Sequence, residues 1–262
     1  RGVNNFPMVP EVGLTYLNKA IKSNYPKALN LYAMLLIEGK IINKDLNLAE
    51  SKLLQGVQLG NTDSMVYLGL LYQSTNMKLN ESVDLFKRAA RKKNLRGMFN
   101  YANSLQHGIG SLEKDEEKAA KYYKIASDSG YVLATNAYAK CLELGLGIEK
   151  NEVEAAQLYK IAADKNCAAA IRNLGTMYED GRGVQQKYSE ALKCYERAAK
   201  LGDSDAMVYA GLMHEFGKGL EIHFSLAAKC YKSAIKRGNP NGMIGFGRLV
   251  EKSKTGKNAI EE

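Results

Sequence analysis

Residues 173–184 of the chain read NLGTMYEDGRGV and end in two glycines separated by one arginine. Glycines at this spacing can lie against a phosphate group, but a phosphate-binding loop follows a strand and carries further glycines or a Lys-Ser/Thr pair. No strand pattern precedes this stretch. The same Gly-x-Gly occurs four times, and its first glycine recurs at intervals of 37, 36 and 36 residues, at Gly108, Gly145, Gly181 and Gly217. A loop copied at a fixed period is typical of the turns in a helical repeat protein, which argues against a nucleotide site.

A pattern of one large and three small residues accompanies these loops. The large residue, which we call the anchor, occurs at Leu17, Leu53, Phe86, Tyr123, Tyr159, Tyr195 and Tyr231. The positions 3, 11 and 16 residues after each anchor hold only Ala, Gly or Ser in all seven copies. Helices that cross at a distance of ~8–10 Å need small residues at the crossing point, so that large neighbours can enter the grooves. The pattern therefore predicts an all-α fold of stacked helix pairs.

The period also predicts where these helices lie. Six full pairs are expected to begin near Ala28, Ser64, Gly97, Ala134, Ala170 and Ala206. One further helix over about 11–23 precedes the pairs and another over about 242–252 follows them, which makes fourteen helices. We expect an N-terminal extension over 1–10, a single repeat solenoid over 11–252 and a C-terminal tail over 253–262. Because the chain begins at Arg1 without a methionine, we also expect it to be a segment of a longer protein.

Residues 173–202, NLGTMYEDGRGVQQKYSEALKCYERAAKLG, resemble a Sel1-like repeat, which is related to the tetratricopeptide repeat. The resemblance covers about residues 13–250 and is weaker at the start, where the second copy lacks the Gly-x-Gly and is three residues short. It implies a right-handed α-solenoid of about six helix-pair repeats with an extra helix at each end.

Nothing in the sequence indicates catalysis, a metal site or a cofactor. The three histidines occupy different repeat positions, and we expect His214 to be packed or partly buried. Glutamates recur at intervals of 36 residues, at Glu143, Glu179, Glu215 and Glu251. Since equivalent positions on stacked helices all face the same way, we interpret these glutamates as surface carboxylates near helix ends rather than as paired general acids. The sequence thus predicts a protein that is not an enzyme and has no small-molecule substrate.

The apolar content and the cysteines of the chain indicate its cellular compartment. Apolar residues make up 45% of the chain, and no apolar run approaches the ~20 residues that a transmembrane helix needs. The spacing of the cysteines fits neither a zinc site nor a disulfide framework, so we expect reduced thiols and a cytoplasmic location. The four are Cys141, Cys167, Cys194 and Cys230.

The resemblance also implies a binding surface. In the related tetratricopeptide architecture, the helix that carries Leu-Gly-x-x-Tyr lines a concave groove. The equivalent positions here give a candidate site for partner proteins or peptides at Arg96, Phe99, Asn103, Asn136, Lys140 and Arg172. Asparagine amides can donate to and accept from a peptide backbone, and Arg or Lys can meet a carboxylate.

A second candidate surface is a basic cluster. The net charge of the chain is +9, and residues 87–96, KRAARKKNLR, hold six basic residues and no acidic one. Basic residues stabilise a helix C-terminus, but a cluster this dense can also attract the acidic segment of a partner protein. It lacks any known nucleic-acid motif, which disfavours specific nucleic-acid binding. The cluster consists of Lys87, Arg88, Arg91, Lys92 and Lys93.

These features predict a protein-interaction scaffold or adaptor. One alternative is a structural component packed permanently into a large assembly, such as a cytoskeletal or microtubule-associated one. Another is a subunit of a membrane-protein degradation complex, against which the unpaired cysteines argue if the subunit is luminal.

Overall fold

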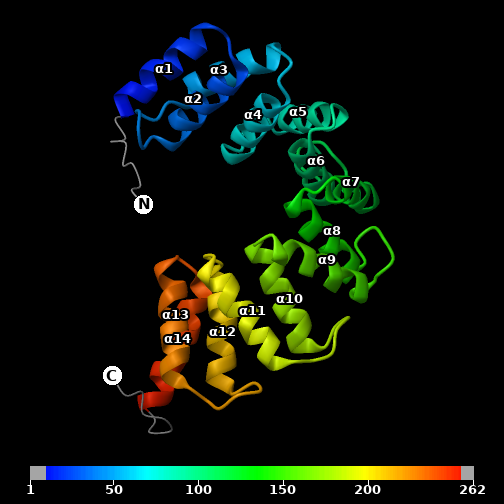
Figure 1. Ribbon diagram of the computed structural model, residues 1–262, viewed down its shortest axis with the longest axis vertical. Helices are drawn as coiled ribbons and strands as arrows, with labels where there is room; N and C mark the ends of the chain where they lie inside the picture. The colour runs from blue at the N-terminus through cyan, green and yellow to red at the C-terminus, as the bar shows by residue number, and fades with distance from the viewer. Residues whose placement is uncertain (1–9, 255–262) are drawn as a thin grey trace, which may run out of the picture. The chain divides into compact units, whose positions relative to one another are not determined.

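The computed structural model describes residues 10–254, and its regular structure in that range is entirely α-helical (Figure 1). Thirteen helices have 13 residues each and the last has 15. They are α1 Pro10–Lys22, α2 Pro26–Glu38, α3 Leu46–Gln58, α4 Thr62–Ser74, α5 Leu79–Arg91, α6 Leu95–His107, α7 Glu116–Asp128, α8 Val132–Leu144, α9 Glu152–Asp164, α10 Ala168–Asp180, α11 Tyr188–Lys200, α12 Ser204–Phe216, α13 Phe224–Lys236 and α14 Pro240–Lys254. The predicted all-α fold and its fourteen helices are confirmed for this range.

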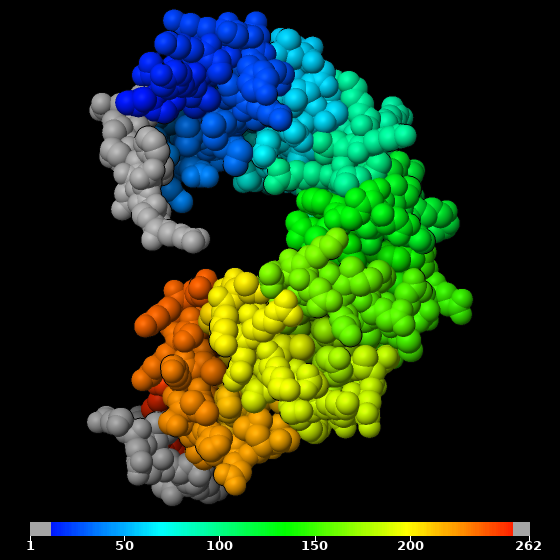
Figure 2. All heavy atoms as spheres, viewed as in Figure 1, coloured from blue at the N-terminus to red at the C-terminus, as the bar shows by residue number. Residues whose placement is uncertain are grey.

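The chain divides into two compact units, residues 1–122 and 123–262, and the division falls inside α7. Within each unit, consecutive helices pack side by side in chain order (Figures 1 and 2). The predicted pairs begin with the even-numbered helices α2 to α12, each of which starts two residues before its predicted position. Helix α1 begins at Pro10 and α14 ends at Lys254, close to the predicted bounds of the solenoid at residues 11 and 252. The rest of the predicted extension and tail lies outside the described residues, and the single solenoid stays a prediction.

Asparagine and aspartate begin several of these helices. The side chains of Asn61, Asn94, Asn151 and Asp203 each accept a hydrogen bond from the backbone N–H three residues on, at 2.8–3.0 Å. Such caps satisfy one of the N–H groups that the first turn of a helix leaves without a partner. A side-chain cap of this kind therefore begins α4, α6, α9 and α12.

Each glycine of the Gly-x-Gly loop is required for a different structural reason. Gly181 follows α10 with φ +71°, and its N–H donates to the carbonyl of Met177, which closes the helix in the left-handed conformation. Gly183 has φ +65° and lies so close to the Glu152 carbonyl at the start of α9 that a Cβ would collide with it. The second glycine thus allows the loop to pack on the preceding helix pair.

The three small-residue positions meet where helices cross. A Cβ on Gly97 of α6 would lie 2.6 Å from the Cβ of Ala89 on α5. A Cβ on Gly175 of α10 would lie 2.7 Å from the Tyr195 ring of α11. Contacts this short leave no room for a larger residue, and so the predicted packing role of these positions is confirmed.

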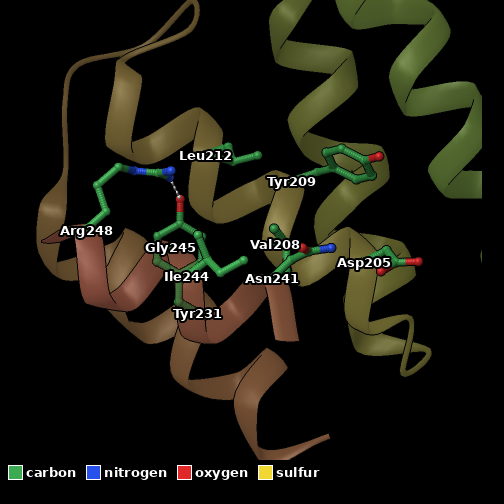
Figure 3. A pocket seen from close by; sticks show the side chains of 9 residues that line it. All are labelled: Asp205, Val208, Tyr209, Leu212, Tyr231, Asn241, Ile244, Gly245 and Arg248. Carbon is green, nitrogen blue, oxygen red and sulfur yellow. Dashed lines mark hydrogen bonds between the residues drawn. The ribbon is translucent and has the colours of Figure 1, made fainter. Parts of the chain in front are cut away.

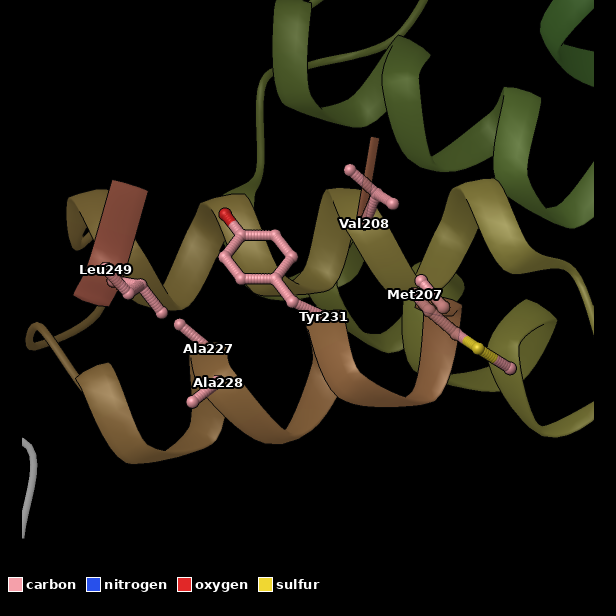
Figure 4. Packing of buried hydrophobic residues seen from close by; sticks show 7 residues of the cluster. Met207, Val208, Ala227, Ala228, Tyr231 and Leu249 are labelled. Atoms are coloured by element: carbon pink, nitrogen blue, oxygen red, sulfur yellow. The ribbon is translucent and has the colours of Figure 1, made fainter. Parts of the chain in front are cut away.

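The anchors form the core between the crossing helices. Tyr123, Tyr159, Tyr195 and Tyr231 are fully buried. Figure 4 shows Tyr231 projecting from α13 among Met207 and Val208 of α12 and Leu249 of α14. The buried rings supply much of the apolar contact area that holds one helix pair on the next.

Candidate interaction surface

The even-numbered helices carry the predicted binding residues, and in unit 2 these occupy the two repeat positions that α8 fills with Asn136 and Lys140. We call the residues at these two positions in unit 2 the even-helix strip. It comprises Asn136 and Lys140 on α8, Arg172 and Thr176 on α10, Val208 and Leu212 on α12, and Ile244 and Arg248 on α14. Phe99 and Asn103 on α6 occupy the same repeat positions in unit 1 and are half-buried.

Arg96, the remaining predicted residue of unit 1, is exposed at the start of α6. Its guanidinium donates to the hydroxyl of Tyr67 at 3.0 Å and lies 5.1 Å from the centre of that ring. The contact joins α6 to α4, and it fixes the charged group on the surface rather than leaving it to sample many rotamers.

In unit 2 the strip begins with a polar network. The amide nitrogen of Asn173 donates to the side-chain oxygen of Asn136 at 3.1 Å, and Arg172 donates to Asn173 at 3.0 Å. Arg172 also forms an ion pair with Asp203 at 3.1 Å. Because Asp203 caps α12, the network ties α8, α10 and α12 together. Arg172 thus meets a carboxylate of its own chain, while the predicted binding role of these residues stays a prediction.

Lys140 differs from its neighbours in the strip because it is exposed to solvent. A substitution of Lys140 therefore tests binding with little effect on the fold, whereas a substitution of Asn136 or Arg172 also breaks the network.

At its other end the strip is largely apolar and lines a pocket of about 230 Å³ between α12 and α14, to which Asp205, Asn241 and Arg248 add polar groups (Figure 3). Val208, Tyr209 and Leu212 line it from α12, and Ile244 lines it from α14. Ile244 is 63% exposed. The sequence prediction missed Tyr209 and Ile244. The signal was the replacement of Asn136 and Arg172 by Val208 and Ile244 at equivalent positions.

Three of the four recurrent glutamates are not the surface carboxylates that we predicted from the sequence, whereas Glu251 is exposed near the end of α14, as predicted. Hydroxyl groups of the anchor tyrosines donate to the other three, Tyr159 to Glu143 at 2.6 Å, Tyr195 to Glu179 at 2.7 Å and Tyr231 to Glu215 at 2.7 Å. The side chains of Glu143 and Glu179 are 11% and 14% exposed, and that of Glu215 is fully buried. The prediction was wrong because a buried tyrosine hydroxyl needs an acceptor, which the end of the preceding helix supplies.

A basic side chain completes each of these sites. Arg182 pairs with Glu143, and Lys218 pairs with Glu179. Arg182 and Lys218 are the middle residues of two Gly-x-Gly loops, so the loop that first suggested a phosphate site binds a carboxylate of the preceding repeat. In the last copy, Arg248 and Lys252 of α14 pair with Glu215 at 2.6 and 2.8 Å.

These contacts perturb the titration of the last site. Burial by itself raises the pKa of Glu215, but hydrogen bonds from Arg248, Lys252 and Tyr231 outweigh burial and lower this pKa to about 2. Burial and the hydrogen bond to Glu215 raise the pKa of the Tyr231 hydroxyl. Such a site is charged and satisfied at neutral pH, which suits a structural role better than proton transfer.

The basic cluster lies at the end of α5 and in the following turn, as predicted. Arg88, Arg91, Lys92 and Lys93 are exposed, and Lys87 is half-buried. Arg88 lies 3.6 Å from Asp84, and Lys92 donates to the Gly60 carbonyl after α3 at 3.4 Å. Part of the cluster therefore stabilises helix ends, and its predicted role in binding an acidic partner stays a prediction.

Neither a metal site nor a membrane span is found in the part of the chain that the structure describes. There, His, Cys, Asp and Glu side chains form no group of three or more that could hold a metal ion. None of the helices described is long and apolar enough to cross a bilayer. His214 is 7% exposed, which confirms its predicted packed position.

Comparison with solved structures supports the same fold. A Sel1 repeat protein from Oxalobacter formigenes is 24% identical, with a TM-score of 0.74 over 80% of this chain and 85% of that one. A protective antigen of uropathogenic Escherichia coli is 24% identical, with a TM-score of 0.69 over 94% of this chain. This chain spans about half of that antigen's length, at 53%. Yeast Tom70 is 14% identical, with a TM-score of 0.56 over 98% of this chain and 54% of that one.

Sequence comparison identifies the family. A search of curated proteins found no match. The model of the Sel1 repeat matches residues 95–131, 132–167, 168–203 and 204–239, which together make up more than half of the chain. The matches begin at α6, where the sequence pattern also becomes regular. The chain therefore belongs to the Sel1 repeat family.

Proposed function

We propose that this protein is a non-catalytic scaffold that binds partner proteins on the even-helix strip of unit 2. The Sel1 repeat fold is generally a scaffold for protein interactions, which supports the class of function. The pocket between α12 and α14 is the observation that favours the even-helix strip as the binding surface. It occupies the repeat positions at which the resemblance to tetratricopeptide repeats implies peptide binding, and it offers an apolar site beside fixed polar groups.

The polar network favours this surface because it holds the strip in one arrangement before a partner arrives. Asn136, Asn173, Arg172 and Asp203 are each restrained by hydrogen bonds to a neighbouring helix. A surface whose side chains are already ordered loses less conformational entropy on binding, and so more of the contact energy appears as affinity.

The shape and charge of the strip indicate the kind of partner. The pocket can accept one apolar side chain, packed against Tyr209, Leu212 and Ile244. Lys140 lies exposed on α8, where it can meet a carboxylate. We propose an extended partner segment with an apolar residue for the pocket and an acidic residue for Lys140.

A pair of neighbouring substitutions tests the pocket. Ile244 lines it, whereas Met243, which is 56% exposed on the same helix, does not. Partners captured by the whole chain are identified by mass spectrometry, and the affinity of each is then measured for both variants. Ile244→Glu should weaken partner binding at least tenfold, because it places a charge against an apolar side chain, and Met243→Glu should leave it within about twofold.

A matched pair of charge reversals tests the polar end. Lys140→Glu should weaken the binding of an acidic partner, and Lys160→Glu, an exposed lysine on α9, should not. If all four variants bind each partner like the wild type, the even-helix strip is not the working surface. Partners recovered in fixed stoichiometry, and unaffected by all four substitutions, would instead favour a structural component of a larger assembly.

The proposal includes the reducing, cytoplasmic setting expected from the sequence. The four cysteines are free thiols, and Cys141 is buried. Burial raises the pKa of the Cys194 thiol to about 11, which lowers its reactivity at neutral pH.

A further inference from the structure

The odd-numbered helices of unit 2 form a different surface, which contains a groove of about 450 Å³ between α11 and α13. Met207, Ala210 and His214 of α12 line it from the intervening helix. Leu226 lies along it on α13 and is 42% exposed. Lys200 and Lys229, which belong to α11 and α13, are both exposed residues of the lining.

Ala210 makes this groove unlike those of the other repeats. It stands directly before Gly211, the last of the three small positions of its copy. The equivalent position holds a large residue in the other six copies, at Tyr32, Leu68, Tyr101, Tyr138, Leu174 and Phe246. Ala210 is 2% exposed, so the missing side chain leaves space at the bottom of the groove rather than at its rim.

His214 is the second unusual residue. It lies one helical turn after Ala210, at a repeat position where the other copies have Leu, Tyr or Val. Its Nδ1 is buried and has no hydrogen-bond partner among the described residues. Tyr72, the equivalent residue of α4, instead donates its hydroxyl to Glu50 at 2.7 Å. The buried polar atom of His214 thus lacks a hydrogen-bond partner among the described residues, whereas the hydroxyl of the equivalent Tyr72 has one.

A groove of similar size between α3 and α5 of unit 1 shows what is specific here. Its volume is about 430 Å³, and most of its lining residues occupy repeat positions that also line the α11–α13 groove, although the equivalents of Lys200 and Met207 do not line it. Glu81 and Asp84 stand there in place of Leu226 and Lys229. The lining of the α3–α5 groove thus holds two acidic residues and one basic residue, Arg88. That of the α11–α13 groove holds two basic residues, Lys200 and Lys229, and one acidic residue, Glu196.

The charges of the two helices point to one class of occupant. Together α11 and α13 carry six basic and two acidic side chains. One of the acidic side chains, Glu190, is already paired with Lys193 at 2.8 Å. From this complementarity we propose that the α11–α13 groove binds an acidic peptide segment that inserts an apolar side chain over Ala210, between Lys200 and Lys229.

Refilling the groove tests the inference. Ala210→Leu with His214→Tyr restores the residues that Leu174 and Tyr178 already supply in α10, so this double variant should fold. A phage-displayed library of random 12-residue peptides is panned on the whole chain with counter-selection on the refilled variant. Enriched peptides should carry an apolar residue flanked by Asp or Glu. A synthetic copy should bind the refilled variant at least tenfold more weakly in fluorescence anisotropy.

Reversing the charges of the two groove lysines provides an independent test if the refilled variant fails to fold. Lys200→Glu with Lys229→Glu should weaken the same peptide at least tenfold and flatten its salt dependence. Lys160→Glu with Lys236→Glu makes an equal change of charge on exposed residues outside the groove lining, and should leave the affinity within about twofold. Ile244→Glu should not affect this peptide, which separates the inference from the proposed function of the even-helix strip.

Several results would overturn the inference. Panning could yield no peptide that distinguishes the two proteins, or only peptides without acidic residues. A dimer detected by light scattering and lost in the refilled variant would identify a second copy of the chain as the occupant. Binding to phosphatidylserine vesicles that is lost in the same variant would identify a membrane surface instead.

Discussion

Two glycines at the same repeat position differ in how closely a neighbouring helix packs against them. Gly175 and Gly247 share one repeat position, the last of the three small ones, and both lie within helices. A Cβ on Gly175 would lie 2.7 Å from the Tyr195 ring, whereas a Cβ on Gly247 would meet no atom of the described residues within 4 Å. We therefore predict that Gly175→Ala lowers the free energy of unfolding by about 1–3 kcal/mol, because the anchor ring must move.

Gly247→Ala is the matched control for this substitution. It should raise the free energy of unfolding by about 0.4–1 kcal/mol, since alanine restricts the unfolded chain and meets no obstacle in the folded one. Urea unfolding followed by circular dichroism measures both changes. Two changes of the same sign would contradict the assignment of Gly175 to a helix crossing.

Glu215 should make stability depend on pH in the acid range. Its folded pKa is about 2, against an ordinary value of 4.5. Because the folded pKa is the lower one, the stabilisation is fully present above pH 4.5 and is lost as the pH falls towards 2. The difference corresponds to roughly 3 kcal/mol for this fully buried carboxylate.

The comparison of wild type with Glu215→Gln measures this contribution. Between pH 6 and pH 3, the free energy of unfolding of the wild type should fall more steeply than that of the variant. Glu221→Gln removes an exposed carboxylate and should leave the slope nearly unchanged. Parallel curves for all three proteins would show that the site around Glu215 does not form in solution.

The Gly-x-Gly loop within one helix pair also binds the preceding pair. Arg182 leaves its own loop to pair with Glu143, which also accepts from Tyr159. Arg182→Ala would leave this mostly buried carboxylate with one partner fewer. We predict that the substitution lowers the free energy of unfolding by roughly 1–2 kcal/mol. The value is kept low because the Arg182 side chain is 31% exposed and solvent screens its charge.

An exposed ion pair supplies the control for Arg182. Lys193 and Glu190 are 69% and 41% exposed on α11. Lys193→Ala should leave the free energy of unfolding unchanged within the error of the measurement, because an exposed ion pair is screened by solvent. Equal losses in the two variants would mean that the Gly-x-Gly arginine contributes no more than any surface charge.

The helices themselves could be predicted from the sequence because their signals are local. Small residues at fixed intervals from an anchor act within one helix pair, and the structure confirms their packing where helices cross. The partners of Glu143 were missed because they belong to later elements, Tyr159 to α9 and Arg182 to the loop after α10. Only the stacking of three successive elements brings these side chains together, and a periodic glutamate alone cannot reveal it.

The sequence predicted where the candidate site lies, but it did not predict the contacts and the polarity of its side chains. The repeat phase placed Asn136, Lys140 and Arg172 on one layer of helices. It could not show that Arg172 is paired with Asp203 or that the layer ends in an apolar pocket at Ile244. Both facts depend on side-chain geometry between neighbouring repeats, which composition and spacing leave undetermined.

The division into two units gives a prediction for the whole molecule. In repeat proteins each helix pair contacts mainly its neighbours, so stability is close to a sum of local terms. About three repeats suffice for independent folding. Helices α7 to α14 make three pairs with one further helix at each end, and they include all the helices of unit 2. We therefore predict that a fragment of residues 113–262 folds by itself.

The choice of residue 113 keeps the start of α7 intact, because the Asp115 side chain accepts from the Lys118 N–H at 2.8 Å and caps that helix. The fragment should show the helical circular dichroism expected for its eight helices and one cooperative thermal transition. If the even-helix strip of unit 2 is the binding surface, the fragment should also bind partners with an affinity close to that of the whole chain. Ile244→Glu should weaken this binding as strongly in the fragment as in the whole chain. A fragment that folds but has lost its partners would move the binding surface to unit 1, where Arg96, Phe99, Asn103 and the basic cluster would become the residues to substitute.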